Sequence, residues 1–419
     1  MQTGWRVGSL FNIPLYIDNS WFFIVLLITF LQGTNPDLQG VVGGTAGAWA
    51  AGLALALLLF ASVLAHELGH SLVARSQGIN VNSIKLFLFG GIASIESESK
   101  TPGQAFQVAA AGPAVSLILY VALTVIGNSV ALPLVAKSLI LSVATTNLIL
   151  ALFNLIPGLP LDGGQIFKAA VWKVTNSRAK GVRWAARSGQ LVGFGGIGLG
   201  LLAFAGGAGL IGLWPALIGL FILRNAKNYN RMNDLQEGLS KLKVSDATIR
   251  DFRVLDADMT LREFADEYLL LDQKVAPVYF ASSDGRYRGL VSIDGLRQVE
   301  RSEWEHRNLQ SIAQPLLDIP HVSENMPLTE AIELIEQKQL SRLTVLTPAD
   351  SVAGTIDRGD VVRAVAKQMN FKVPEALIQK VKEDGAYPAG LQLGAIAQSI
   401  KQGARHSLTE EITSSCLLR

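Results

Sequence analysis

The chain is poor in cysteine and, over its first half, poor in acidic residues. Its lone cysteine, Cys416, has no partner within the chain, which excludes a disulfide-rich secreted module. Residues 1–231 contain six acidic and 14 basic residues, whereas 232–419 contain the remaining 28 acidic and 22 basic residues. The basic residues of the first part do not form a soluble face, so we expect no direct binding of nucleic acid. We also expect no cleavable signal peptide, because the mixed stretch 1–18 precedes the first apolar run.

Charged residues make up only 17% of the chain and hydrophobic residues 49%, with a mean hydropathy of +0.34. This balance is too apolar for an ordinary soluble protein and too polar for one that lies wholly in lipid. Runs long enough for a crossing of about 20 residues occur at 19–34, 47–75, 104–127, 133–157, 188–206 and 209–225. We therefore predict a polytopic α-helical membrane protein with about six transmembrane helices. The last two runs are short and rich in glycine, so a re-entrant pair is the alternative.

Lysine and arginine collect on alternate connections between these runs. The connections 35–46, 128–132 and 206–208 contain no basic residue, whereas basic residues occur before the first run, in the other connections and after the last run. Because basic residues favour the cytoplasmic side, we expect both termini and the soluble part to be cytoplasmic. We expect an integral multi-pass membrane protein, in a prokaryotic cell membrane.

Two histidines and a glutamate lie in the second apolar run, where ionisable residues are rare. His66 and His70 are one helical turn apart and project from one face, and Glu67 lies about 100° further round the helix. The spacing His-Glu-x-x-His is that of a zinc site in which the glutamate is the general base and not a ligand. The alternative is a chance pair of histidines beside a glutamate on a packed helix.

A catalytic zinc needs a third protein ligand. The other histidines, His306, His321 and His406, lie in the soluble part. Asp162 follows the fourth apolar run in a stretch whose prolines and glycines interrupt a helix, on the expected cytoplasmic side where His66 and His70 also lie. We therefore predict these three residues as the ligands of one Zn²⁺ per chain. Asp162 also suits the N-cap of a helix over 163–174, and the two roles do not exclude each other.

These residues resemble the site-2 protease family of intramembrane zinc metalloproteases. The resemblance covers about 1–231 and rests on His-Glu-Leu-Gly-His at 66–70, Asn-x-x-Pro-x-x-Pro-x-Asp-Gly at 154–163 and Gly-Pro-Ala-Val-Ser at 112–116. It implies that His66, His70 and Asp162 hold zinc, that Glu67 is the catalytic base, and that the second to fourth spans form the catalytic core. The family often has asparagine where this chain has Ser116. The alternative for 112–116 is that the segment merely allows close helix packing.

Residues 81–96 are too few to span a membrane and indicate a β-hairpin with one apolar face around a Gly-Gly turn. Its edge is suited to pair with an unwound substrate strand and place a peptide bond at the zinc. The alternative is a hairpin that only seals the membrane mouth. We expect Phe89, Gly90 and Gly91 of this hairpin, together with Asn154, to position the substrate.

Residues 244–366 contain a repeat with a period of about 65 residues. The segment 258–264 reappears as 325–331, and 275–292 reappears as 341–357. This pattern resembles a tandem pair of CBS domains, at about 244–304 and 309–366. The resemblance implies an adenine nucleotide between the repeats, bound through Ser292, Asp357 and Asp360. Each repeat departs from the family pattern. In the first repeat Gly295 stands where the family often has an aspartate, and in the second Asp357 stands where the family often has a hydroxyl residue. Structural pairing without a ligand is therefore the alternative.

Three parts are expected: a membrane-embedded metalloprotease domain at 1–231, a soluble α/β tandem CBS module at 240–370, and a C-terminal tail at 371–419. The expected function is hydrolysis of a peptide bond in or near a transmembrane segment, as in regulated intramembrane proteolysis, with modulation by adenine nucleotide. By resemblance, the substrate is a membrane-tethered transcription regulator or anti-sigma factor, and a homodimer through the repeats is a candidate assembly. The alternative is a CBS-gated transporter or channel with a metal site, which predicts polar residues in several spans.

Overall fold

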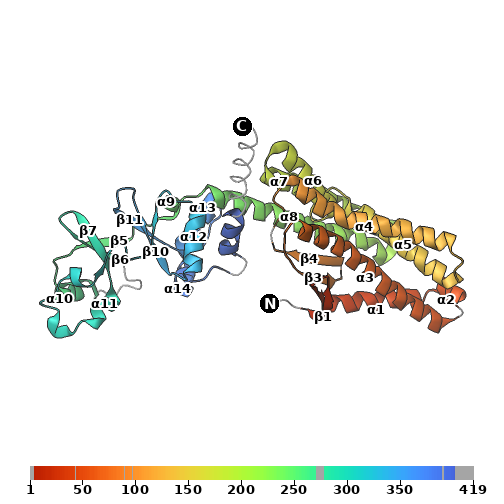
Figure 1. Ribbon diagram of the computed structural model, residues 1–419, viewed down its shortest axis with the longest axis horizontal. Helices are drawn as coiled ribbons and strands as arrows, with labels where there is room; N and C mark the ends of the chain where they lie inside the picture. Colours follow the sequence, from red (N-terminus) through yellow and green to blue (C-terminus); the bar gives the residue numbers. More distant parts are fainter. Residues whose placement is uncertain are drawn as a thin grey trace. The chain divides into compact units, whose positions relative to one another are not determined.

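The computed structural model describes residues 4–42, 44–88, 90–96, 98–269, 278–388 and 391–401. The chain divides into two compact units, Met1–Asn233 and Asp234–Arg419. The first unit is a helix bundle with a small sheet, and the second contains two small sheets with helices (Figure 1).

The helices of the first unit include long apolar ones. Their bounds are α1 (Asn19–Gly33), α2 (Pro36–Val42), α3 (Thr45–Ser76), α4 (Pro102–Ser129), α5 (Leu134–Asn154), α6 (Asp162–Thr175), α7 (Arg178–Ala203) and α8 (Trp214–Lys241), which extends past the unit boundary. A π-helical turn (Phe204–Ala208) and a 3-10 turn (Gly209–Leu213) connect α7 to α8. Figure 1 shows α3, α4 and α5 running side by side.

Four stretches of the described chain are long and apolar enough to cross a membrane. They are α3, α4, α5 and Arg178–Ser240, which holds α7, its turn and most of α8. The predicted fifth and sixth runs are therefore two helices joined by a turn, and a Cβ on Gly219 would lie 2.6 Å from Gly193 O, as close small-residue packing requires. The first predicted run forms α1, whose 15 residues extend about 22 Å, less than the roughly 30 Å of a bilayer core.

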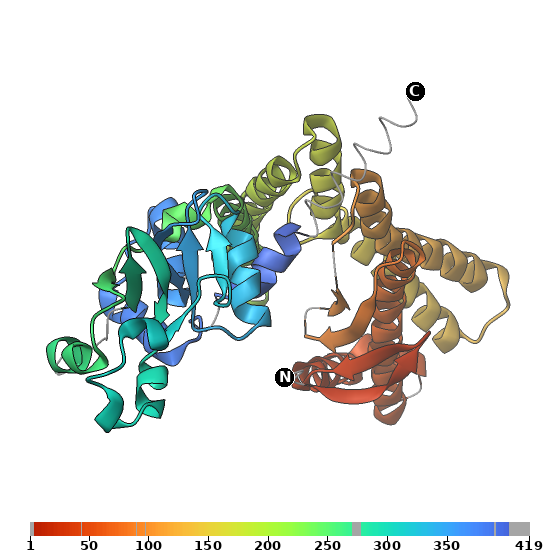
Figure 2. The same cartoon turned by 60° about the vertical axis from the view of Figure 1, so that its left-hand side comes forward.

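A four-stranded sheet belongs to the first unit. Its strands are β1 (Trp5–Leu10), β2 (Ile13–Ile17), β3 (Val81–Phe87) and β4 (Gly90–Ile95), in that order, with β4 at one edge. Strands β2 and β3 are parallel, and β3 and β4 form the predicted antiparallel hairpin. Figure 2 shows these red and orange strands beside helices of the same colours. The sequence indicated the β3–β4 hairpin but not the pairing with β1 and β2.

Packing around α3 fixes the frame of the first unit. Val25 of α1, Phe60 and Val63 of α3, and Leu86 of β3 share one buried cluster. The carboxylate of Asp18, which caps α1, lies 2.7 Å from Lys85 Nζ of β3. The hydrogen bond from Lys85 lowers the pKa of Asp18 to about 2. The hairpin is therefore tied to α1 by both apolar packing and an ion pair.

The second unit repeats one strand pattern twice. Strands β5 (Phe252–Asp256), β6 (Val278–Ser283), β7 (Arg286–Val291) and β8 (Ala313–Gln314) form one sheet; β9 (His321–Ser323), β10 (Arg342–Leu346) and β11 (Val352–Asp357) form the other. In each repeat a parallel pair, β5–β6 or β9–β10, precedes an antiparallel pair, β6–β7 or β10–β11. This confirms the predicted repeat, of which 270–277 lie outside the described residues.

Helices cover the sheets of the second unit. They are α9 (Val244–Ala247), α10 (Leu261–Phe264), α11 (Ile293–Gln298), α12 (Leu328–Gln337), α13 (Arg358–Gln368) and α14 (Glu375–Asp384), with a π-helical turn at Ala265–Leu269 and 3-10 turns at Arg301–Glu303 and Leu309–Ser311. Ile332 of α12, Ile356 of β11 and Val361 of α13 share a core with Val381 of α14. Residues 375–384 of the expected tail are thus part of this core.

Candidate metal centre

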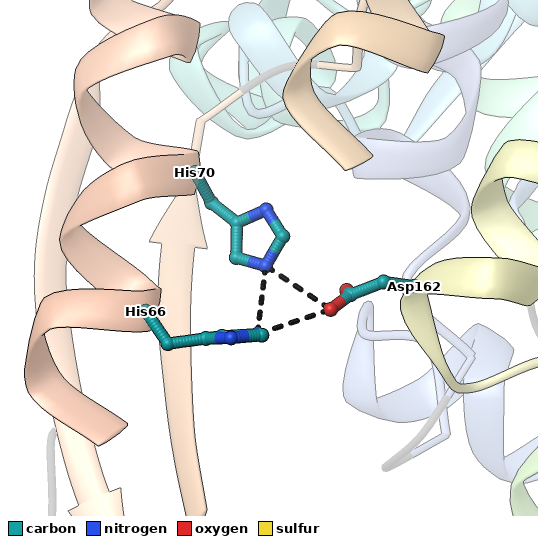
Figure 3. A group of neighbouring side chains, drawn as sticks. All are labelled: His66, His70 and Asp162. Atoms are coloured by element: carbon teal, nitrogen blue, oxygen red, sulfur yellow. Dashed lines mark hydrogen bonds and ion pairs between the residues drawn. The ribbon is translucent and has the colours of Figure 1, made fainter. Parts of the chain in front are cut away.

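Two histidine rings converge from α3. His66 and His70 follow each other by one helical turn and are both buried, with 4% and 9% of their surface exposed. Their Nε2 atoms lie 3.2 Å apart. Figure 3 shows both rings directed from the same helix towards Asp162.

Asp162 completes the group from the first turn of α6. Its Oδ2 lies 3.0 Å from His66 Nε2 and 3.3 Å from His70 Nε2. The segment before α6 is held in place because Leu159 is fully buried and its N–H donates to Ala185 O of α7. Asp162 is the first residue of α6 and Leu161 is the N-cap. The alternative of Asp162 as the N-cap is therefore wrong, and its carboxylate faces the histidines instead.

The three side chains fit a zinc ion. One ligand atom from each lies within 4.8 Å of the others, and two imidazole nitrogens with one carboxylate oxygen are a donor set that zinc accepts in catalytic sites. Gly112 of α4 forms the wall of this space: a Cβ there would lie 2.6 Å from His66 Nε2 and would contact His70 Nε2 even more closely. The absence of a side chain at 112 thus leaves room between the two rings.

The other nitrogen of each ring bonds to α4. His66 Nδ1 lies 2.9 Å from Ser116 Oγ, and His70 Nδ1 lies 2.7 Å from Val108 O. Partners of this kind hold the rings of metal-binding histidines in orientation. The sequence motif at 112–116 contains Ser116 but does not reveal this hydrogen bond. Val108 escaped prediction because a backbone carbonyl leaves no signature in the residue type.

Glu67 faces the β3–β4 hairpin. The contact is made at the start of β4. A Cβ on Gly91 of the same strand would lie 3.0 Å from Glu67 Cδ and would overlap Cγ. The side chain of Glu67, which is next to His66 on α3, therefore packs against the start of β4.

The other predicted substrate-positioning residues lie on two elements. Gly90 and Gly91 begin β4 instead of forming the turn, whereas Phe89 lies outside the described residues. Asn154 ends α5. In the part of the chain that the structure describes, no hydrogen bond joins its side chain to the His–His–Asp group.

The predicted nucleotide-binding residues cap two helices of the second unit. Ser292 caps α11, and Asp357 caps α13 in a capping box with Asp360. Both aspartates are nearly buried, and Lys382 Nζ of α14 lies 2.6 Å from Asp360 Oδ1 and 3.1 Å from Asp357 Oδ2. Burial raises the pKa of Asp360 to about 6, although the hydrogen bond from Lys382 opposes this rise. Among the described residues, no hydrogen bond connects Ser292 with either aspartate.

Family models match both units of the chain. The model of peptidase family M50 matches residues 54–134 and 130–194, and the CBS domain model matches 311–367. The two ranges matched by the M50 model together contain all three residues of the His–His–Asp group.

Relatives match over most of the chain. A Synechocystis protein assigned as a zinc metalloprotease is 41% identical over 87% of this chain and 96% of its own length. Rip3 of Mycobacterium tuberculosis, also assigned as a zinc metalloprotease, is 35% identical over 83% of this chain and 90% of its own. The solved site-2 protease from Methanocaldococcus jannaschii is 28% identical, covers 54% of this chain and 95% of its own, and has a TM-score of 0.41.

Relatives that are 41% and 35% identical over most of both chains, together with the family match, establish the class of enzyme. Zinc metalloproteases hydrolyse peptide bonds, and the long apolar helices of the first unit make the chain a membrane protein. The chain belongs to peptidase family M50, the site-2 protease family of zinc metalloproteases, and carries a CBS domain in its second unit.

Proposed function

We propose that the protein cleaves a peptide bond in or near a transmembrane segment of a membrane-protein substrate, with one zinc ion held by His66, His70 and Asp162. The observation that carries this proposal is the His–His–Asp group, in which both histidines are buried and the ligand atoms converge within 4.8 Å, in a unit built of long apolar helices. Ionisable groups are energetically costly at membrane depth, so their presence there indicates a functional site.

The chain's own residues supply the proton transfers. Zinc, when bound, supplies a Lewis acid that polarises the scissile carbonyl and lowers the pKa of water. Glu67 accepts a proton on its carboxylate from the attacking water as the new C–O bond forms, and it passes this proton to the amide nitrogen as the C–N bond breaks.

The free edge of β4 receives the substrate in this proposal. Strand β4 ends the sheet, so one row of its backbone groups is free of strand partners within the sheet and can pair with an extended peptide. The helix around the scissile bond must unwind first, since helical carbonyls are already hydrogen-bonded. Gly90 and Gly91 allow the substrate backbone to approach Glu67, and Asn154 at the end of α5 contacts the unwound segment.

The proposed setting is a prokaryotic cell membrane. Both termini lie on its cytoplasmic side, which is the side that the distribution of basic residues favours. Membrane-tethered transcription regulators and anti-sigma factors are substrates that suit regulated intramembrane proteolysis. The second unit binds an adenine nucleotide through Ser292, Asp357 and Asp360, modulates cleavage and provides a surface for a homodimer. In this proposal the carboxylates of Asp357 and Asp360 accept hydrogen bonds from ribose hydroxyls once the nucleotide displaces Lys382.

Cleavage by purified full-length protein in vesicles tests the proposal. A panel of single-span membrane proteins is incubated with wild type and with Glu67→Gln, and the new termini are mapped by mass spectrometry. We expect cuts within or next to the apolar segment with wild type only. Cuts confined to water-exposed loops, or equal cutting by Glu67→Gln, would contradict it.

A further inference from the structure

We propose that Ser116 is a positioning residue that fixes the ring of His66, with Nε2 directed at the metal position and Nδ1 protonated. This inference rests on the proposed zinc site. It assigns a role to a residue of α4, whereas the proposed ligands come from α3 and α6.

The two histidines present the same nitrogen to the centre. The Nε2 atoms of His66 and His70 both face Asp162 Oδ2, so each ring can offer the centre a lone pair only if its Nδ1 carries the proton. For His70 the protein imposes that tautomer, because Val108 O can only accept a hydrogen bond. For His66 the partner is the Ser116 hydroxyl, 2.9 Å away, which accepts from Nδ1–H when Nε2 faces the metal.

Burial makes this contact hard to replace. Ser116 is fully buried and His66 is 4% exposed. Removing the hydroxyl leaves the Nδ1–H without a partner in a place where water does not readily substitute, and an unsatisfied buried donor is costly. The ring is then free to rotate or to adopt the other tautomer, either of which withdraws Nε2 from the metal.

The helix geometry explains why a short hydroxyl side chain does this. Val108, Gly112 and Ser116 follow each other at intervals of four, so they lie on one face of α4. Val108 contacts His70, Ser116 contacts His66, and Gly112 lies between them against both rings. Because Gly112 lets α4 approach α3 closely, a side chain with one carbon reaches Nδ1. Ser116 is therefore part of a surface on α4 that is shaped to the two imidazoles.

Zinc release from purified full-length protein tests this role. The rate of transfer to a fluorescent chelator is measured for wild type, Ser116→Ala, Ser116→Thr and the control Ser71→Ala. Ser71 is also fully buried, but its hydroxyl has no hydrogen-bond partner in the described part of the chain. We expect Ser116→Ala to release zinc about 10- to 100-fold faster, the usual effect of losing such a partner. Ser116→Thr keeps the hydroxyl and should restore slow release, and Ser71→Ala should match wild type.

Two further measurements keep the outcome decisive. The visible spectrum of the cobalt-substituted protein should change in Ser116→Ala and not in Ser71→Ala. Only the loss of the Ser116 hydroxyl changes the orientation of a metal ligand, the ring of His66. If Ser116→Ala fails to fold, Ser116→Cys replaces the hydroxyl with a somewhat larger thiol that is a weaker acceptor, and it should release zinc at an intermediate rate. Wild-type release and spectrum in Ser116→Ala would overturn the inference, as would equal effects in Ser116→Ala and Ser71→Ala. A wild-type protein without zinc would instead refute the proposed function.

Discussion

Gly91 of β4 lies against the side chain of Glu67, so closely that a Cβ at 91 would overlap the glutamate's Cγ. This contact joins β4, the strand proposed to pair with the substrate, to Glu67, the proposed general base. It also means that the base can be displaced without changing any ligand of the metal.

Gly91→Ala should therefore separate zinc binding from cleavage. The added methyl group pushes the Glu67 carboxylate from its place, so we expect normal zinc content and at least about a tenfold loss of cleavage rate, since general base catalysis contributes about 10²–10⁴-fold. The matched control is Ser94→Ala, an exposed position on the same strand. Zinc content by mass spectrometry and cleavage in vesicles provide the check, and full activity of Gly91→Ala would refute the contact's importance.

Gly112→Ala should abolish zinc binding. Its Cβ would stand between the two Nε2 atoms that face the metal position, so the chain should fold without retaining the ion. Gly103→Ala on the same helix is the control, because a Cβ at 103 meets nothing within 4 Å. Metal content of the two purified variants is the measurement. Equal zinc in both would show that the ion lies elsewhere.

The metal ligands and the base could be predicted from the sequence, whereas the hydrogen-bond partners of the two histidines could not. The spacing of His66, Glu67 and His70 is local, and one helix suffices to bring the three residues to adjacent faces. Asp162 was predicted from its place after the fourth apolar run, because an interrupted helix and a shared membrane side restrict where a third ligand can lie. The hydrogen bonds to Ser116 and Val108 depend on how α4 packs on α3, and no local pattern determines that packing.

The N-terminal sheet and the role of α14 also escaped prediction, for physical reasons. Every residue of β1 is exposed, so the strand has no buried face from which its place in the sheet could have been predicted. Its turn uses Phe11 and Asn12 with positive φ, and phenylalanine is not a residue that signals such a turn. The contact of Lys382 with Asp357 and Asp360 joins segments that are distant in sequence.

Lys382→Ala should strengthen nucleotide binding. Its ammonium occupies the two carboxylates proposed to bind ribose, so a nucleotide must compete with it. Because a hydrogen bond to a charged group contributes about 1.5–3 kcal/mol, we expect the Kd for AMP to fall about tenfold or more. Lys380→Ala, an exposed position on the same helix, is the control. Calorimetry on the full chain checks this, and identical affinities for both variants would show that Lys382 does not compete.

The proposed orientation is open to a reporter test. Fusions after Lys100, Arg183 and Met232 should report the cytoplasm, and fusions at Pro36 and Asn128 the opposite side, because basic residues favour cytoplasmic connections. Alkaline phosphatase and green fluorescent protein give complementary signals for the two sides. A non-cytoplasmic signal at Met232 would place the second unit across the membrane and contradict the orientation.

The decisive measurement for the His–His–Asp zinc site is the zinc stoichiometry of wild type and four purified variants, read by mass spectrometry. Wild type should contain one zinc per chain, and His66→Ala, His70→Ala and Asp162→Ala should each lose most of it, because each removes one of three converging ligand atoms. Glu67→Gln should keep the ion and lose cleavage, since the glutamate moves protons in this account and holds no metal. Full zinc in Asp162→Ala, or zinc lost together with activity in Glu67→Gln, would contradict it.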